Sequence, residues 1–165
     1  MQQSPVEVER KWLVQDLPDL SGHESKEVIQ GYIAIAADGT EVRLRQTDGK
    51  FFQTMKSEGG LVRDEIEIEL TQEQFKALWS ATAGRRLKKT RYSWHWQGRT
   101  VEIDVYHGAL AGLIVAEVEF PSALASAQFA PPPWFGREVT EDKHYKNVTL
   151  ALHGRSPHWQ RQDIQ

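Results

Sequence analysis

Charged and apolar residues alternate along several segments of this chain, and this alternation limits the fold more than any other feature of the sequence. The clearest case is the segment 61–70, in which Glu65 and Glu67 alternate with Ile66 and Ile68. Successive side chains of a β-strand point to opposite faces, so the glutamates share one face and the isoleucines share the other. The spacing therefore predicts strands with one charged face and one apolar face.

Charges of one sign are also kept together on each of these segments. The acidic pairs at alternate positions are Glu7 and Glu9, Glu65 and Glu67, Glu102 and Asp104, and Glu117 and Glu119. The basic pairs are Arg43 and Arg45, and Lys89 and Arg91, and they are accompanied by the single cations Lys11 and Lys56. Neighbouring like charges on a strand repel each other, and a solvated face usually mixes them with neutral polar residues. Solubility alone does not explain such sorting.

Glycine-containing turns separate most of the alternating segments. We expect strands over residues 6–14, 24–36, 40–47, 50–57, 61–70, 85–97, 99–106 and 113–120. We expect short helices at 72–83, in the alanine-rich stretch before Pro131, and at 141–153. Tight turns join antiparallel strands, whereas parallel strands need long crossovers. The predicted fold class is therefore mainly antiparallel β (α+β), and alternation alone does not show whether the sheet closes into a barrel.

Length and composition predict a single domain and exclude several classes of function. The chain has 165 residues, and we expect one domain over 1–152 followed by a polar tail over 153–165. The net charge of -3 does not favour nucleic acid, and no apolar run reaches signal-peptide or membrane-spanning length. The chain has no cysteine and no glycine-rich phosphate loop, and its histidines are scattered. We expect a cytoplasmic monomer or homodimer without nucleic-acid or membrane partners.

The sorted charges allow two interpretations. In the first, they form the solvated face of a simple meander. In the second, they line the inside of a closed or cupped sheet, where burying both signs of charge is expensive unless a ligand compensates them. A polyphosphate bound to divalent cations would do so, because Arg and Lys bind phosphate oxygens while Glu and Asp bind Mg²⁺ or Mn²⁺. The partner expected from the second interpretation is a small-molecule triphosphate.

Short motifs follow one another in a fixed order along the chain. They are Glu7-Val-Glu-Arg-Lys11, Gln30-Gly31-Tyr32, Arg43-Leu-Arg45, Lys56, Arg63-Asp-Glu65-Ile-Glu67, Lys89-Thr-Arg91-Tyr92, Glu102-Ile-Asp104, Gly112-Leu113, Ala116-Glu117-Val-Glu119, Glu138-Val-Thr140 and Tyr145-Lys-Asn147. The first is similar to the Glu-x-Glu-x-Lys signature of the CYTH superfamily, the triphosphate tunnel metalloenzymes. The resemblance to this family extends over about residues 4–152.

The resemblance implies an eight-stranded closed β-barrel tunnel with a few short flanking helices. It implies that a linear triphosphate binds in the lumen together with the cofactor, Mg²⁺ or Mn²⁺. The residues that resemble the family's metal ligands are Glu7, Glu9, Glu117 and Glu119. Those that would act near the metal or the attacking water are Glu65, Glu67 and Asp104. The cations that resemble its phosphate-binding residues are Lys11, Arg43, Arg45, Lys56, Lys89 and Arg91.

The family includes inorganic triphosphatases, thiamine triphosphatases and class IV adenylyl cyclases. The chain lacks the long C-terminal helical domain of some bacterial members and resembles the compact type, for which inorganic triphosphatase is the commoner activity. We therefore expect metal-assisted attack of water on tripolyphosphate, giving diphosphate and phosphate. The alternatives are a thiamine triphosphatase, an adenylyl cyclase, and a binder of polyphosphate or nucleotide without catalysis.

Overall fold

A computed structural model describes residues 8–57 and 65–154 of the chain. Its strands are β1 (Val8–Val14), β2 (Ser25–Ile35), β3 (Glu41–Thr47), β4 (Lys50–Lys56), β5 (Glu65–Leu70), β6 (Arg86–Trp96), β7 (Arg99–Tyr106), β8 (Ile114–Phe120) and β9 (Phe135–Glu138). Its α-helices are α1 (Gln72–Trp79), α2 (Ala123–Gln128) and α3 (Asn147–His153). Its short 3₁₀ turns are η1 (Ser80–Thr82), η2 (Gly108–Leu110) and η3 (Lys143–Tyr145).

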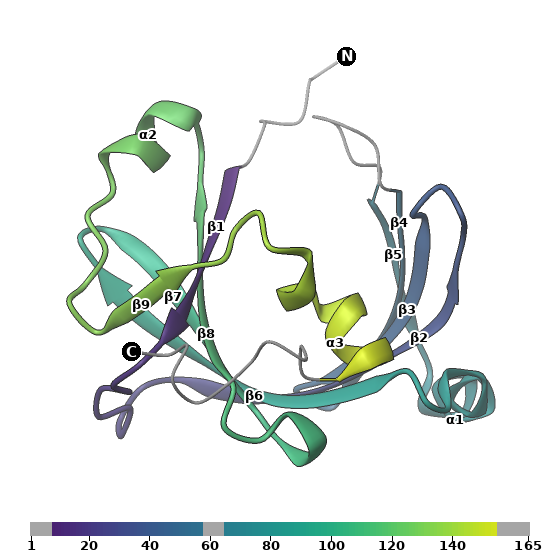
Figure 1. Cartoon of the computed structure of the whole chain (residues 1–165). Coiled ribbons are helices and arrows are strands. Elements are labelled where there is room, and N and C mark those ends of the chain that lie inside the picture. The colour runs from purple at the N-terminus through teal and green to yellow at the C-terminus, as the bar shows by residue number, and fades with distance from the viewer. Residues whose placement is uncertain (1–7, 58–64, 155–165) are drawn as a thin grey trace.

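All nine strands belong to one sheet, in the order β5-β4-β3-β2-β6-β7-β8-β1-β9. Every pairing in it is antiparallel, which confirms the predicted fold class. The sheet curves strongly, so that β4 and β5 form a wall opposite β1 and β8, and α3 lies on the concave side between the two walls (Figure 1). The concave side is therefore enclosed by strands that are far apart in the order of the sheet.

The structure has nine strands where eight were expected, because the alternation did not reveal β9. This strand has only four residues, too few to display a two-residue period, and it pairs with β1 at Trp12 and Val14. Among the described residues, pairing ends at β5 on one side and at β9 on the other, so the closed barrel is not confirmed. Apolar residues of α3 pack against residues of β1, β2, β6, β7 and β8, at the base of the concave side.

The two faces of the sheet bury different cores. On the concave side, Leu150 of α3 packs with Leu13 of β1 and Tyr32 of β2. On the convex side, Trp12 of β1 is 3% exposed and contacts the ring of Phe135 at a centroid distance of 4.9 Å. The cores occupy alternate positions of the same strands, so the alternation in the sequence correctly separated the two faces.

Helix α1 is shorter than the stretch 72–83 that the sequence predicted. Thr71 caps its start, because the Thr71 hydroxyl accepts a hydrogen bond from the amide of Gln74 while the Gln74 side chain accepts one from the amide of Thr71. The ring of Phe75 packs on Phe51 of β4 at 4.9 Å between centroids. After Trp79 the chain tightens into η1, which brings this segment close to β2.

The predicted helix at 141–153 is divided in two. η3 ends at Tyr145, Lys146 has an extended backbone with φ -67° and ψ 139°, and α3 follows. Burial of Tyr145 in the concave core accounts for the interruption. The domain boundary expected after residue 152 falls in the last turn of α3, and residues 155–165 of the predicted tail lie outside the described residues. No helix in the described ranges is long and apolar enough to cross a membrane.

Gly31→Ala is expected to destabilise the fold by about 1–3 kcal/mol, because the new methyl group would overpack the contact between β2 and η1. A Cβ atom at Gly31 would lie 2.7 Å from Cβ of Thr82 and 2.8 Å from Cζ3 of Trp79. Urea unfolding measures the effect. Gly49→Ala is the control, since it adds no contact within 4 Å and costs only left-handed backbone strain, about 1 kcal/mol. A loss clearly below about 1 kcal/mol in Gly31→Ala would contradict the packing argument.

Candidate functional site

The side chains of the candidate site come together through the register of three adjacent strands. Glu9 of β1 pairs with Glu119 of β8, and Lys11 of β1 pairs with Glu117 of β8. Glu117 in turn lies opposite Glu102 of β7. Directly opposed residues of antiparallel strands have side chains on the same face. The register therefore gathers carboxylates from three strands on the concave side.

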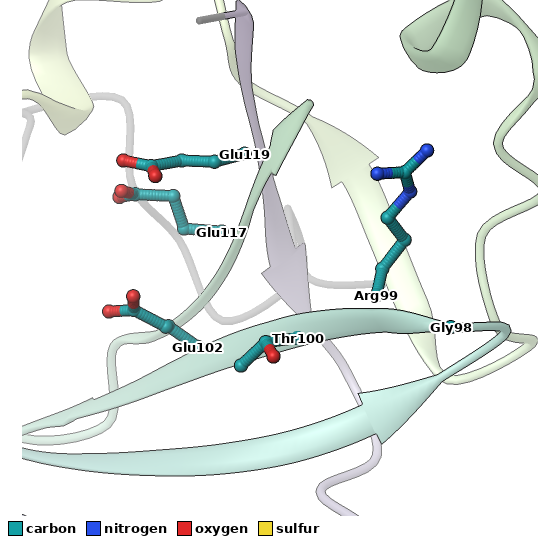
Figure 2. Close-up of a pocket in the computed structure, with 6 residues that line it drawn as sticks. All are labelled: Gly98, Arg99, Thr100, Glu102, Glu117 and Glu119. Atoms are coloured by element: carbon teal, nitrogen blue, oxygen red, sulfur yellow. The ribbon is translucent and has the colours of Figure 1, made fainter. Parts of the chain in front are cut away.

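Three of these carboxylates form a compact cluster. One oxygen each from Glu9, Glu117 and Glu119 lies within 4.8 Å of the other two. Glu117 and Glu119 point to the same side as Glu102, beside a cavity of about 250 Å³ (Figure 2). Glu7, the fourth carboxylate predicted as a metal ligand, lies outside the described residues. The structure thus brings together three of the four predicted metal ligands.

The electrostatics of this cluster suit a divalent cation. Desolvation of its carboxylate, together with the neighbouring Glu117, raises the pKa of Glu9 to about 7, although the side chain as a whole is exposed. Carboxylates so close together repel each other, and a hard divalent cation relieves this repulsion because it prefers oxygen ligands. Glu9, Glu117 and Glu119 therefore fit a hard divalent cation by chemistry and spacing.

Lys11 lies beside the carboxylate cluster and is held from two sides. Its Nζ is 3.9 Å from Oε2 of Glu117 and donates to the carbonyl oxygen of Tyr145 at 3.3 Å. Its backbone amide donates to the hydroxyl of Thr140 at 3.0 Å. The segment between β9 and α3 therefore fixes the position of this cation next to the candidate metal ligands.

The opposite wall carries the predicted cations of β3 and β4. Arg45 contacts Glu67 of β5, with Nη2 3.4 Å from Oε2, and the hydroxyl of Thr54 donates to the same oxygen at 3.0 Å. Lys56 pairs across the sheet with Glu41 and also with Glu65. Glu65 and Glu67 thus lie among cations at the edge strand β5, and the carboxylate cluster found among the described residues does not include them.

Two arginines of β3 have buried donors without an acceptor. Within the described ranges, the Nε atoms of Arg43 and Arg45 are buried and have no hydrogen-bond partner. Burial, and then the charge of Arg43, lower the pKa of Arg45. A buried donor that lacks an acceptor costs free energy. An anion with several oxygens would satisfy both groups.

The pair Lys89 and Asp104 is the most buried ionic group described. Lys89 is 2% exposed and Asp104 is 3% exposed, and Nζ lies 2.7 Å from Oδ2. Arg91 donates to both Asp104 oxygens, from Nε at 2.7 Å and from Nη2 at 2.9 Å. Burial alone would raise the pKa of Asp104, but Lys89 and Arg91 hold it well below its usual range. Asp104 therefore binds two cations of its own chain.

Arg91 also reaches towards the carboxylate cluster. Its Nη1 lies 2.5 Å from Oε2 of Glu102, an ion-pair contact outside hydrogen-bond geometry. Lys89 instead lies under α3, where Asn147 Oδ1 is 3.5 Å from its Nζ and accepts from the hydroxyl of Tyr106 at 2.6 Å. The two cations of one motif therefore have different surroundings, with Lys89 buried and Arg91 half-buried.

The sequence did not predict two buried, uncharged residues of β2 as part of the candidate site. Gln30 and Tyr32 are 2% and 0% exposed, and Gln30 Nε2 donates to the Tyr32 hydroxyl oxygen at 2.7 Å. Burial raises the pKa of Tyr32 to about 12, against a lowering influence of Arg43. Their only signal in the sequence was their place in the motif Gln30-Gly31-Tyr32, because neither residue contributes to the sorted charges.

The chain is similar to curated proteins over most of its length. A protein named inorganic triphosphatase from Nitrosomonas europaea is 52% identical over 148 residues, which are 89% of this chain and 97% of that protein. A second protein of this name, from Acetivibrio thermocellus, is 34% identical over 149 residues, 88% of this chain and 92% of that protein.

Solved structures share the fold. The crystal structure of the inorganic triphosphatase NE1496 is 47% identical, has a TM-score of 0.74, and is matched over 91% of this chain and 97% of that one. The PH1012 protein from Pyrococcus horikoshii OT3 is 17% identical with a TM-score of 0.55 over 96% of this chain and 99% of that one, a likeness of fold alone. The model of the CYTH domain matches residues 5–153. The chain therefore belongs to the CYTH family.

Proposed function

We propose that the protein is a divalent-metal-dependent inorganic triphosphatase that hydrolyses tripolyphosphate to diphosphate and phosphate. The observation that carries the proposal is the pairing of the Glu9, Glu117 and Glu119 cluster with the buried, acceptor-free donors of Arg43 and Arg45 on the same concave face. A metal-chelated triphosphate satisfies both, because it offers anionic oxygens to the arginines and shares its cations with the carboxylates. The relatives named inorganic triphosphatase support the same activity.

Under this proposal the carboxylate cluster holds Mg²⁺ or Mn²⁺. Glu9, Glu117 and Glu119 are the ligands among the described residues, and Glu7 remains a predicted fourth ligand. The cation, when bound, polarises phosphate oxygens as a Lewis acid. Phosphoryl transfer depends on positioning and on neutralising charge more than on covalent help from the protein. The chain therefore needs no nucleophilic side chain.

The cations on the concave face would bind and orient the phosphates. Lys11 and Arg91 lie close to the carboxylates, whereas Arg43 and Arg45 supply donors from β3. Lys56 and Lys89 remain predicted phosphate ligands. Lys89 is buried against Asp104. This burial supports an effect of its charge on the phosphates from below the site rather than by direct contact.

The predicted catalytic carboxylates take different roles in the proposal. Asp104 is a positioning residue in this proposal, because Lys89 and Arg91 engage both of its oxygens. Glu67 positions Arg45 in the same way. Orientation of the attacking water by Glu65 or Glu67 stays a prediction.

Several broader expectations also stay predictions. They are the closed tunnel, the cytoplasmic location, the state as monomer or homodimer, and the absence of nucleic-acid and membrane partners. Alternative activities on thiamine triphosphate or ATP use the same phosphate-binding residues. The described residues that line the cavity are Gly98, Arg99, Thr100, Glu102, Glu117 and Glu119. All are small, polar or charged, and a lining without aromatic rings does not favour a nucleobase.

Glu117→Gln is expected to lower Mg²⁺-dependent phosphate release from tripolyphosphate at least about 100-fold, because the cluster loses a charged ligand for the metal. Phosphate release with Mg²⁺, Mn²⁺ or a chelator measures the loss. Glu73→Gln, in the first turn of α1, removes the same charge away from the cluster and should retain activity. Both variants should melt within about 3 °C of the wild type. Full activity of Glu117→Gln would refute the metal assignment.

Wild-type protein is expected to cleave tripolyphosphate with a kcat/KM at least about tenfold above the values for ATP and thiamine triphosphate, since the organic groups gain no stacking partner in the cavity. Phosphate and cyclic-nucleotide release from the three substrates make the comparison. Faster turnover of thiamine triphosphate, or formation of cyclic AMP, would favour the corresponding alternative. Tight binding of tripolyphosphate without turnover would identify a non-catalytic binder.

Asp104→Asn is expected to destabilise the protein by about 3–5 kcal/mol, because Lys89 would stay buried without its counter-ion. Urea unfolding measures the loss. The Asp104 pKa is lowered in the fold, so its stabilisation is complete above the ordinary carboxyl range and is lost only as the pH falls towards the depressed value. The difference from wild type should therefore be constant between about pH 5 and 8 and shrink below about pH 4.

Asp142→Asn is the matched control for this experiment. Its carboxylate lies 3.6 Å from Arg137 and 2.8 Å from Nδ1 of His144, and it is far less buried than that of Asp104. An exposed ion pair contributes at most about 1 kcal/mol. A loss in Asp104→Asn no larger than that in Asp142→Asn would show that the buried carboxylate does not support the site.

A further inference from the structure

Strand β2 contains a β-bulge at the point where it supplies Tyr32 to the concave face. Tyr32 pairs with Arg43 of β3, but the next pair is Ala34 with Val42, so Ile33 is an extra residue. A bulge interrupts the ladder, redirects the side chains around it, and leaves backbone groups to be satisfied elsewhere. Whatever binds those backbone groups controls the direction of Tyr32.

Arg85 binds this bulge from the side of β6. Its Nε donates to the carbonyl oxygen of Tyr32 at 2.9 Å, and its Nη2 donates to that of Ile33 at 3.3 Å. Its own carbonyl oxygen accepts from the amide of Tyr32 at 3.0 Å. Regular pairing between β2 and β6 has its last pair at Gly31 and Arg86, one residue before the bulge. Arg85 therefore continues the contact between the strands where the ladder ends.

The guanidinium of Arg85 is itself anchored. Nη2 also donates to the carbonyl oxygen of Ala81, and the backbone amide of Arg85 donates to the carbonyl oxygen of Thr82 at 2.9 Å. Thr82 packs closely on Gly31, the residue that precedes Tyr32. The turn η1 thus fixes Arg85, and Arg85 fixes the two carbonyl groups of the bulge.

Tyr32 passes this constraint on to the phosphate-binding arginine. Its side chain is fully buried, and its hydroxyl oxygen accepts from Gln30 and lies close enough to Arg43 for that charge to lower the Tyr32 pKa. Arg43 is also the direct cross-strand partner of Tyr32. A change in the direction of the Tyr32 side chain would therefore shift the guanidinium of Arg43, whose Nε lacks an acceptor among the described residues.

We propose that Arg85 is a positioning residue for triphosphate binding, acting through the bulge and the Tyr32 hydroxyl on Arg43. Arg85 itself does not touch the substrate, since its donors bind carbonyl groups of β2 and η1. The inference rests on the proposed triphosphatase function, because Arg43 matters here as a ligand of phosphate. It adds a specific route by which a residue beside the site controls the geometry of the site.

A double-mutant cycle tests the route. Arg85→Gln should lower kcat/KM for tripolyphosphate about tenfold in the wild-type background but no more than about twofold in the Tyr32→Phe background, because the hydroxyl that relays the effect is gone. A merely structural Arg85 would reduce activity by the same factor in both backgrounds. Equal factors would overturn the inference. If Arg85→Gln fails to fold, Arg85→Lys, which can reach only one carbonyl group at a time, is used in the same cycle.

Arg86→Gln is the matched control. Arg86 donates to the hydroxyl of Thr82 and to the carbonyl oxygen of Trp79, and none of its described hydrogen bonds goes to the carbonyl groups of the bulge. It should change kcat/KM by no more than about twofold. NMR of ¹³C-labelled tyrosine gives a readout independent of turnover: Arg85→Gln should shift the ring signals of Tyr32, and Arg86→Gln should leave them in place. A shift with both variants, or with neither, would overturn the inference.

Failure of the proposed function and failure of the role of Arg85 give different results. Absence of tripolyphosphate hydrolysis by the wild type would overturn the proposed function, while the Tyr32 signals would still report whether Arg85 sets the position of that ring. If the wild type hydrolyses tripolyphosphate but Arg85→Gln lowers kcat/KM by the same factor in both backgrounds, the function stays intact and the role of Arg85 is overturned.

Discussion

The arrangement of the concave face depends on the carboxylate of Asp104. Two cations on neighbouring positions of one strand face would repel each other, and Lys89 would not stay charged under α3 without a counter-ion. Asp104 compensates both cations, because Lys89 donates to one of its oxygens and Arg91 donates to both. With Asp104 in place, Arg91 can extend towards Glu102, and the apolar core under α3 can begin directly beneath a charged site.

The charges that remain are divided between the two walls. Glu9, Glu117 and Glu119 lie together on β1 and β8, where they repel each other, and Lys11 lies 3.9 Å from Glu117. Arg45 on the other wall has a carboxylate partner but keeps a buried donor free of an acceptor. Such a division suits a ligand that brings cations to one wall and anionic oxygens to the other, which is the chemistry of a metal-bound polyphosphate.

Alternation in the sequence predicted much of this arrangement, and the misses have physical causes. A two-residue period reports which face a side chain occupies, so the shared face of Lys89 and Arg91 was predictable. It does not report how deep a residue lies along the strand, so the burial of Lys89 under α3 was not. The bulge at Ile33 shifts the period, which hides the direction of the side chains after Tyr32. Strand β9 is too short to show any period.

The end of strand pairing at β5 and β9 among the described residues has a mechanical consequence for a protein with two facing walls. In a closed barrel, hydrogen bonds between the first and last strands would fix the distance across the lumen. Within the described residues β5 and β9 are not paired, so no described hydrogen bond between these strands fixes that distance. A bound polyanion that contacts both walls would add a link between them.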